Sequence, residues 1–175
     1  MKIFGVTGWK NGGKTSLVER LVKEIVSKGY TVSTVKHAHH DVEVDHEGTD
    51  SFRHRVAGAS QVILSSRDLW ALMTENRGAP ELPLEDLLRK LDPVDLVLIE
   101  GYKTAPHPKI ESHRLETGKA PLALENTSII AVASNASPDL DVPVFDLNDT
   151  SLIASFILEQ TGLTSATLGA ASQMS

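Results

Sequence analysis

The stretch GWKNGGKTS, residues 8–16, decides the fold. It follows a short apolar run and fits the pattern G-x-x-x-x-G-K-[S/T], with Gly8, Gly13, Lys14 and Thr15 at the fixed positions. Glycines let the backbone approach an anion closely, so that successive amide groups can surround phosphate oxygens at the start of a helix. The pattern therefore predicts a phosphate-binding loop, unless it is a glycine-rich turn whose lysine is merely solvated.

The residues on either side of this loop provide the context that the motif requires. Residues 2–7 read as a short buried strand. After Thr15, apolar residues recur at helical spacing as far as Lys28 and Gly29, which are typical of a helix end. Residues 31–35 are mostly β-branched and predict a second strand. The sequence thus predicts a strand, loop, helix and strand with a right-handed parallel crossover.

The rest of the chain continues this alternation of strands and helices. Further strands are expected at 61–65, 69–73, 94–99, 128–133 and 142–145, although 69–73 could also be helical. Helices are expected at 50–55, with Asp50 as the cap, at 83–90, and after a cap at Asn148 or Asp149. Residues 102–120 are rich in Pro, His and Lys. We interpret them as a mobile excursion over the sheet edge around a short strand at 109–112, and this segment is the candidate lid.

This pattern predicts an α/β fold of the P-loop three-layer type, with a mostly parallel central sheet and a β-rich excursion. Residues 1–162 are expected to form one nucleotide-binding domain, followed by a disordered tail at 163–175.

Composition excludes several classes of protein. The chain has 175 residues, no cysteine and a net charge of −6. Disulfides and thiolate metal sites are therefore excluded, and the charge opposes a broad grip on nucleic acid. No apolar stretch approaches the roughly 18 residues needed to cross a membrane, and the amino-terminal residues do not resemble a signal peptide. We expect a soluble, cytoplasmic protein without membrane or nucleic-acid partners.

The chemistry expected of the loop needs a metal ion and an acid. Lys14 is expected to reach the β- and γ-phosphates, while Thr15 offers a hydroxyl to Mg²⁺ and Ser16 adds a polar group. Glu100 ends a buried strand whose carboxyl end shares the loop's edge of the sheet, so it is the candidate metal-binding acid. The alternative is a strand-end carboxylate that pairs with a lysine such as Lys103.

Asp50 and the histidines allow more than one interpretation. Asp50 is either a helix cap, a second carboxylate near metal-bound water, or both. His37 directly follows the second strand on the loop's side of the sheet, where it is expected to contact phosphate or take part in closure. The spacing of His37, His39 and His40 also leaves a zinc site open, and a solvated polar loop is the remaining reading.

Together these residues resemble the family of molybdopterin-guanine dinucleotide biosynthesis protein B, known as MobB. The resemblance covers residues 1 to 160, in family order and spacing. Beyond the loop it is carried by KHAHHD at 36–41, GTDSFRHRVAGA at 48–59, WALMTE at 70–75, DLVLIEGYK at 95–103 and IAVASN at 130–135. The resemblance implies a homodimeric P-loop protein that binds GTP with Mg²⁺, hydrolyses it weakly, and assists the guanylyltransferase that attaches GMP to molybdopterin. Molybdopterin itself is a further expected partner.

The resemblance also implies site residues. Those expected to contact the nucleotide are Gly8, Asn11, Gly12, Gly13, Lys14, Thr15, Ser16 and His37, and those in catalytic or metal-binding positions are Lys14, Thr15, Asp50 and Glu100. No Asn/Thr-Lys-x-Asp motif for reading guanine follows a strand, so Ser134 and Asn135 are the best substitute. Related dimeric P-loop proteins carry a lysine after the first glycine, where this chain has Trp9.

Three functions follow as hypotheses. The first is the GTP-binding accessory protein. The second is a small-molecule kinase with residues 102–120 as its lid, in which Lys103, Lys109 and Arg114 neutralise the transferring phosphoryl group. The third is an interaction module that binds phosphate only incidentally. No residue for orienting an attacking water and no arginine finger can be assigned from the sequence, which favours the first.

Overall fold

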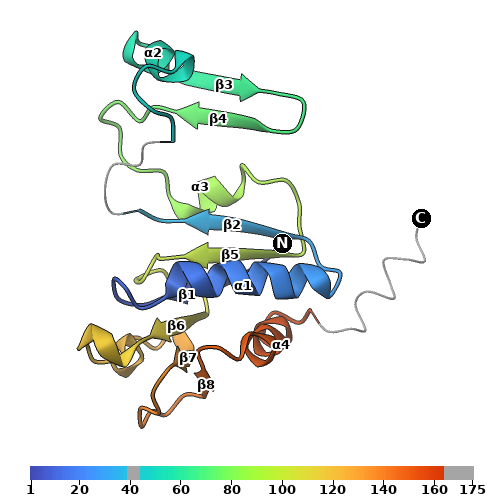
Figure 1. Cartoon of the computed structure of the whole chain (residues 1–175), viewed down its shortest axis with the longest axis vertical. Helices are drawn as coiled ribbons and strands as arrows, with labels where there is room; N and C mark the ends of the chain where they lie inside the picture. The colour runs from blue at the N-terminus through green and yellow to red at the C-terminus, as the bar shows by residue number, and fades with distance from the viewer. Residues whose placement is uncertain (39–43, 164–175) are drawn as a thin grey trace. The chain divides into compact units, whose positions relative to one another are not determined.

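The computed structural model describes residues 1–38 and 44–163 (Figure 1). The chain divides into two compact units, one formed by Met1–His37 with Leu91–Ser175 and the other by Ala38–Lys90. We call them the first and the second unit. Among the described residues, no helix is long and apolar enough to cross a membrane. The prediction of one domain over 1–162 stays a prediction.

The first unit is built on a six-stranded sheet in the order β2-β5-β1-β6-β7-β8. Every neighbouring pair of strands is parallel, which confirms the predicted α/β class with its parallel central sheet. The strands are β1 (Lys2–Thr7), β2 (Val32–Lys36), β5 (Leu96–Glu100), β6 (Lys109–His113), β7 (Ile129–Ser134) and β8 (Val144–Asp146).

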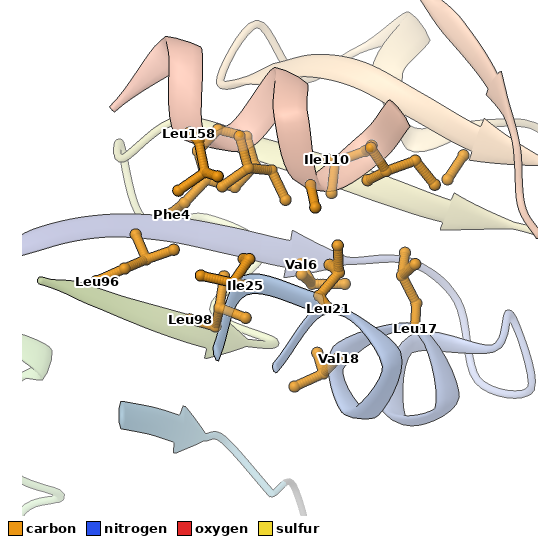
Figure 2. Packing of buried hydrophobic residues seen from close by; sticks show 14 of the residues in the cluster. Phe4, Val6, Leu17, Val18, Leu21, Ile25, Leu96, Leu98, Ile110 and Leu158 are labelled. Carbon is orange, nitrogen blue, oxygen red and sulfur yellow. The ribbon is translucent and has the colours of Figure 1, made fainter. Parts of the chain in front are cut away.

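Two helices of the first unit pack against this sheet and close its core. Helix α1 (Lys14–Ser27) ends at Lys28 and Gly29 as the sequence predicts. Helix α4 (Thr150–Gln160) is capped by Asp149, whose carboxylate accepts a hydrogen bond from the Leu152 amide at 3.0 Å. Figure 2 shows how their apolar faces meet the sheet. The cluster contains Phe4, Val6, Leu17, Leu21, Ile25, Leu96, Leu98, Ile110 and Leu158.

The position of β6 corrects the sequence interpretation. The predicted strand at 109–112 is confirmed, but it lies between β1 and β7 with all its residues buried, not in a mobile excursion over the edge. Its polar side chains are satisfied internally: the Lys109 ammonium donates to the Ser128 hydroxyl at 2.8 Å and to the Ala105 carbonyl. The Glu111 carboxylate accepts from the backbone amides of Leu122 at 2.9 Å and Ala123 at 3.0 Å. A polar sequence can therefore occupy the middle of the sheet.

The loop that follows β6 contains two short 3₁₀ helices, η1 (Leu115–Thr117) and η2 (Leu122–Leu124). Near the end of the chain, Leu163 is buried and its carbonyl accepts a hydrogen bond from the Tyr30 hydroxyl at 3.2 Å. Residues 164–175 lie outside the described residues, and the disordered tail at 163–175 stays a prediction.

The second unit contains a separate antiparallel hairpin, β3 (Gln61–Ser65) and β4 (Trp70–Thr74), which confirms a strand rather than a helix in the second segment. It also contains helices α2 (Asp50–Val56) and α3 (Leu84–Leu88).

The start of α2 corrects a second expectation. The cap is Thr49, whose hydroxyl accepts from the Phe52 amide at 3.4 Å, whereas Asp50 lies in the first turn. Threonine and aspartate are both good caps, so the sequence alone did not decide whether Thr49 or Asp50 caps the helix. Within this unit, Arg55 pairs with the buried Asp45 and with Glu75, and these carboxylates raise its pKa.

We predict that Glu111→Gln destabilises the protein by about 1–3 kcal/mol, because an amide can accept only one of the two backbone hydrogen bonds and turns a donor towards the other. Urea unfolding followed by circular dichroism measures the change. Glu125→Gln removes the same charge from an exposed position and should leave stability almost unchanged. Equal midpoints for the two variants would contradict the bonding of β6.

Candidate functional site

The phosphate loop, residues 8–16, runs from the end of β1 into the first turn of α1 and lies against the end of β6. A Cβ atom on Gly8 would lie 2.3 Å from the Ser112 carbonyl oxygen, and one on Gly12 would lie 2.7 Å from it. The Ser112 hydroxyl donates to the Gly12 carbonyl at 2.7 Å. Glycine is therefore required at both positions by the close approach of β6, as well as by any ligand.

Lys14 lies in a cluster of positive charge. Its ammonium donates to the Trp9 carbonyl within the loop at 2.8 Å. Burial lowers the pKa of Lys14; the nearby Glu100 opposes this, and Lys103 and Lys36 lower the pKa further. Three cations near the start of α1 form an environment that favours an anion with several charges, such as a polyphosphate.

Glu100 and Thr15 lie together at the carboxyl edge of the sheet. The Thr15 hydroxyl donates to the Glu100 carboxylate at 2.9 Å. The Lys36 ammonium lies 3.5 Å from that carboxylate oxygen and 3.4 Å from the Thr15 hydroxyl oxygen. A cation thus already contacts both oxygens. Asp95, by contrast, accepts hydrogen bonds from the Thr31 amide and hydroxyl at 2.8 and 2.7 Å, so it has a structural role.

The residues present fit a magnesium ion. A hydroxyl and a carboxylate are hard oxygen ligands, and Mg²⁺ commonly takes few protein ligands and completes its shell with phosphate oxygens and water. In the described part of the chain, no group of three or more His, Asp and Glu side chains could hold a metal. Any metal bound here by these residues would therefore take its further ligands from nucleotide oxygens and water. Magnesium binding by Thr15 and Glu100 remains a prediction.

Asp50 and His37, the other residues expected to bind metal or phosphate, lie in different units of the chain. Asp50 lies in the second unit with an exposed side chain, 3.7 Å from the Arg53 guanidinium, and its metal role stays a prediction. His37 lies beside the acid: its amide donates to the Glu100 carbonyl at 2.9 Å, and its ring lies 4.6 Å from that of Tyr102. His39 and His40 lie outside the described residues.

The two residues expected to read the base are bonded within the protein. Ser134 is buried, with its hydroxyl 3.0 Å from His113 Nδ1 and accepting from the Ala136 amide. The Asn135 carbonyl oxygen accepts from the Leu115 amide at 3.0 Å, and its amide nitrogen lies 2.9 Å from each Glu116 carboxylate oxygen. Their side chains organise the loop after β7, and their contact with a base stays a prediction.

The sequence suggested Arg114 and Lys103 only as lid cations of the kinase hypothesis, and the structure places both beside the phosphate loop. Beside Gly13, a Cβ atom would lie 2.9 Å from Arg114 Nε, so this guanidinium lies against the phosphate loop. Trp9 donates its indole N–H to the Ala120 carbonyl at 2.9 Å, and the Lys103 ammonium lies 4.4 Å from its ring centroid. Only the placement of β6 beside β1 could have revealed these neighbours.

Comparison with known proteins gives one family. Residues 3–135 match the family described as MobB, molybdopterin guanine dinucleotide synthesis protein B. A molybdopterin-guanine dinucleotide biosynthesis adapter protein from Haemophilus influenzae is 42% identical over 157 residues, covering 89% of this chain and 86% of the relative. The Escherichia coli protein of the same name is 38% identical over 160 residues, covering 90% and 91%.

Solved structures agree with these relatives. The MobB homologue from Bacillus stearothermophilus has a TM-score of 0.70 at 30% identity, covering 94% of this chain and 100% of that chain. Bacillus subtilis MobB has a TM-score of 0.73 at 26% identity, covering 92% and 98%.

Proposed function

The chain belongs to the MobB family, and on that premise we propose that it is a GTP-binding accessory protein with weak GTPase activity. Its role is that of an adapter in molybdopterin guanine dinucleotide biosynthesis, which is how its relatives are described. In this role it assists the guanylyltransferase that joins GMP to molybdopterin, and molybdopterin is a further candidate ligand. Cytoplasmic localisation stays a prediction.

The observation that carries nucleotide binding is the phosphate loop with its cations. The loop is fixed in shape by β6, and Lys14 is close enough to donate to a loop carbonyl across the turn. When a triphosphate binds, the Lys14 ammonium can exchange that carbonyl for phosphate oxygens, and the amides at the start of α1 face the same anion.

Thr15 and Glu100 are the residues that would hold Mg²⁺ beside the nucleotide. The bound ion would neutralise part of the charge on the β- and γ-phosphate oxygens. Lys36 contacts both oxygens and would release them when a divalent cation takes its place. Slow turnover fits a protein whose role is binding, because phosphoryl transfer needs further groups to orient the attacking water.

The kinase alternative loses one of its three expected phosphoryl-neutralising cations, Lys109, whereas Lys103 and Arg114 lie near the phosphate loop. Its lid was residues 102–120, but β6 is a buried central strand and Lys109 is fully buried with its ammonium bonded to Ser128 and Ala105. A lysine in this place is not available to a transferring phosphoryl group.

We propose that the expected homodimer forms through the hairpin of the second unit. Its pairs Ile63 with Leu72 and Ser65 with Trp70 place three apolar side chains on one face, and these are 65%, 46% and 66% exposed for Ile63, Leu72 and Trp70. An isolated two-stranded sheet is only marginally stable in water, and contiguous exposed apolar groups mark interaction surfaces. A second copy of the same hairpin would bury this face.

Lys14→Ala should weaken GTP binding by roughly 10- to 100-fold, because a charge-assisted contact to phosphate is lost while the fold is retained. Isothermal calorimetry of the Mg·GTP complex measures the change. Lys2→Ala removes the same charge at the opposite end of β1 and should bind GTP normally. Unchanged affinity in Lys14→Ala would reject the phosphate assignment.

Glu100→Gln should reduce the affinity for Mg²⁺ in the presence of GTP by roughly tenfold or more, while metal-free GTP binding changes less, because the amide is a weaker ligand than the carboxylate. Magnesium titrations at saturating GTP provide the measurement, with Glu159→Gln as the exposed control. A titration identical to that of the unmodified protein would transfer the metal role to Asp50 or another acid.

Ile63→Asp should weaken dimerisation at least roughly tenfold, since the interface would have to bury an unpaired charge. Sedimentation velocity over a concentration series reports the dissociation constant. Leu152→Asp introduces the same charge at an exposed apolar position on α4 and should leave self-association unchanged. A dimer of Ile63→Asp as tight as the unmodified one would place the interface elsewhere.

A further inference from the structure

We propose that Glu116, held in place by Asn135, is the residue that selects guanine over adenine. The inference rests on the proposed binding of GTP and assigns its base specificity to a carboxylate on the loop after β6. The sequence has no Asn/Thr-Lys-x-Asp motif to read guanine after a strand, and Glu116 would supply the carboxylate that is missing.

The first support is the position of Glu116 relative to the phosphate loop. In a parallel sheet the carboxyl ends of all strands lie at one edge, and β6 directly adjoins β1, which leads into the loop. Arg114 follows β6 immediately and lies against Gly13. Glu116 is two residues further on, in η1, on the side of β1 opposite to Glu100. A nucleotide whose metal-bound phosphates lie towards Glu100 can therefore extend its base towards Glu116.

The second support is that the carboxylate is held from two strands at once. Asn135 follows β7, accepts from the Leu115 amide at 3.0 Å and donates to Glu116, with 2.9 Å from its nitrogen to each carboxylate oxygen. The Glu116 backbone amide, then Asn135, and then the charges of Arg114 and His113 keep the pKa of this carboxyl below its ordinary value. The group is therefore ionised and oriented at neutral pH.

The third support is the pair of acceptors that the carboxylate offers. An ionised carboxylate has about four lone-pair sites, and the one Asn135 N–H group that lies between its two oxygens would give way to the paired donors of a base. Guanine presents the adjacent donors N1–H and N2–H₂, which two carboxylate oxygens can accept together. Adenine presents an acceptor at N1, which a carboxylate repels. A carboxylate therefore selects guanine more strongly than the amide of Asn135 could, and Asn135 becomes its positioning residue.

The chemistry can be tested by changing the pattern of donors. Glu116→Gln replaces one acceptor by a donor, which suits the N1–H and 2-oxo group of xanthine instead of guanine. We expect it to weaken GTP binding roughly tenfold or more, strengthen XTP binding relative to the unmodified protein, and leave ATP binding weak. Calorimetric titrations with the magnesium complexes of GTP, XTP and ATP give the three affinities, and Glu159→Gln is the exposed control.

Asn135→Ala tests the positioning role. It should lower GTP affinity less than Glu116→Gln does and should not favour XTP, because the carboxylate remains but is less ordered.

An equal preference for GTP in the Glu116→Gln and unmodified proteins would overturn the inference, as would an unmodified protein that binds GTP and ATP alike. In both of these outcomes triphosphate binding that is sensitive to Lys14→Ala leaves the proposed function standing. If no triphosphate binds the unmodified protein, both proposals fail.

Discussion

The close approach of the end of β6 to the phosphate loop is the constraint on which the site depends. The Ser112 carbonyl oxygen lies too close for a Cβ atom on Gly8 or Gly12, at 2.3 and 2.7 Å, and the Ser112 hydroxyl bonds to the Gly12 carbonyl across 100 residues of sequence. The glycines of the motif thus satisfy two requirements, room for a ligand and room for a neighbouring strand. The loop is held in shape by this packing as well as by its own sequence.

The same strand shows how a polar sequence can form the centre of a sheet. Lys109, Glu111 and His113 are buried, and each is hydrogen-bonded to a loop that leaves or approaches the sheet. A buried polar group destabilises the fold when it has no hydrogen-bond partner. When it has partners, it fixes the orientation of the segments that it joins. These bonds therefore tie the connecting loops to β6, including the segment that carries Arg114 and Glu116.

The features that could be predicted from the sequence depend on local interactions. The strand before the loop, the helix after it, the Gly29 end and the Asp149 cap depend on neighbours within a few residues, and the structure has all of them. Apolar periodicity cannot recognise KIESH as a buried strand, because the partners of Lys109 and Glu111 lie in separate loops. For the same reason the contacts of Arg114 with Gly13 and of Glu116 with Asn135 could not be predicted.

Strand order now explains how one ligand can meet these separate groups. Along the edge of the first unit, β5, β1, β6 and β7 bring in turn Glu100, the phosphate loop, Arg114 with Glu116, and Asn135. A ligand that contacts all of these groups would need a metal-bound polyphosphate at one end and paired hydrogen-bond donors at the other. A guanine nucleotide has both parts. A polyphosphate or a base by itself would contact only part of this edge. The proposed specificity therefore follows from the insertion of β6 between β1 and β7, which separates Glu100, the acid proposed for the metal, from Glu116, the acid proposed for the base.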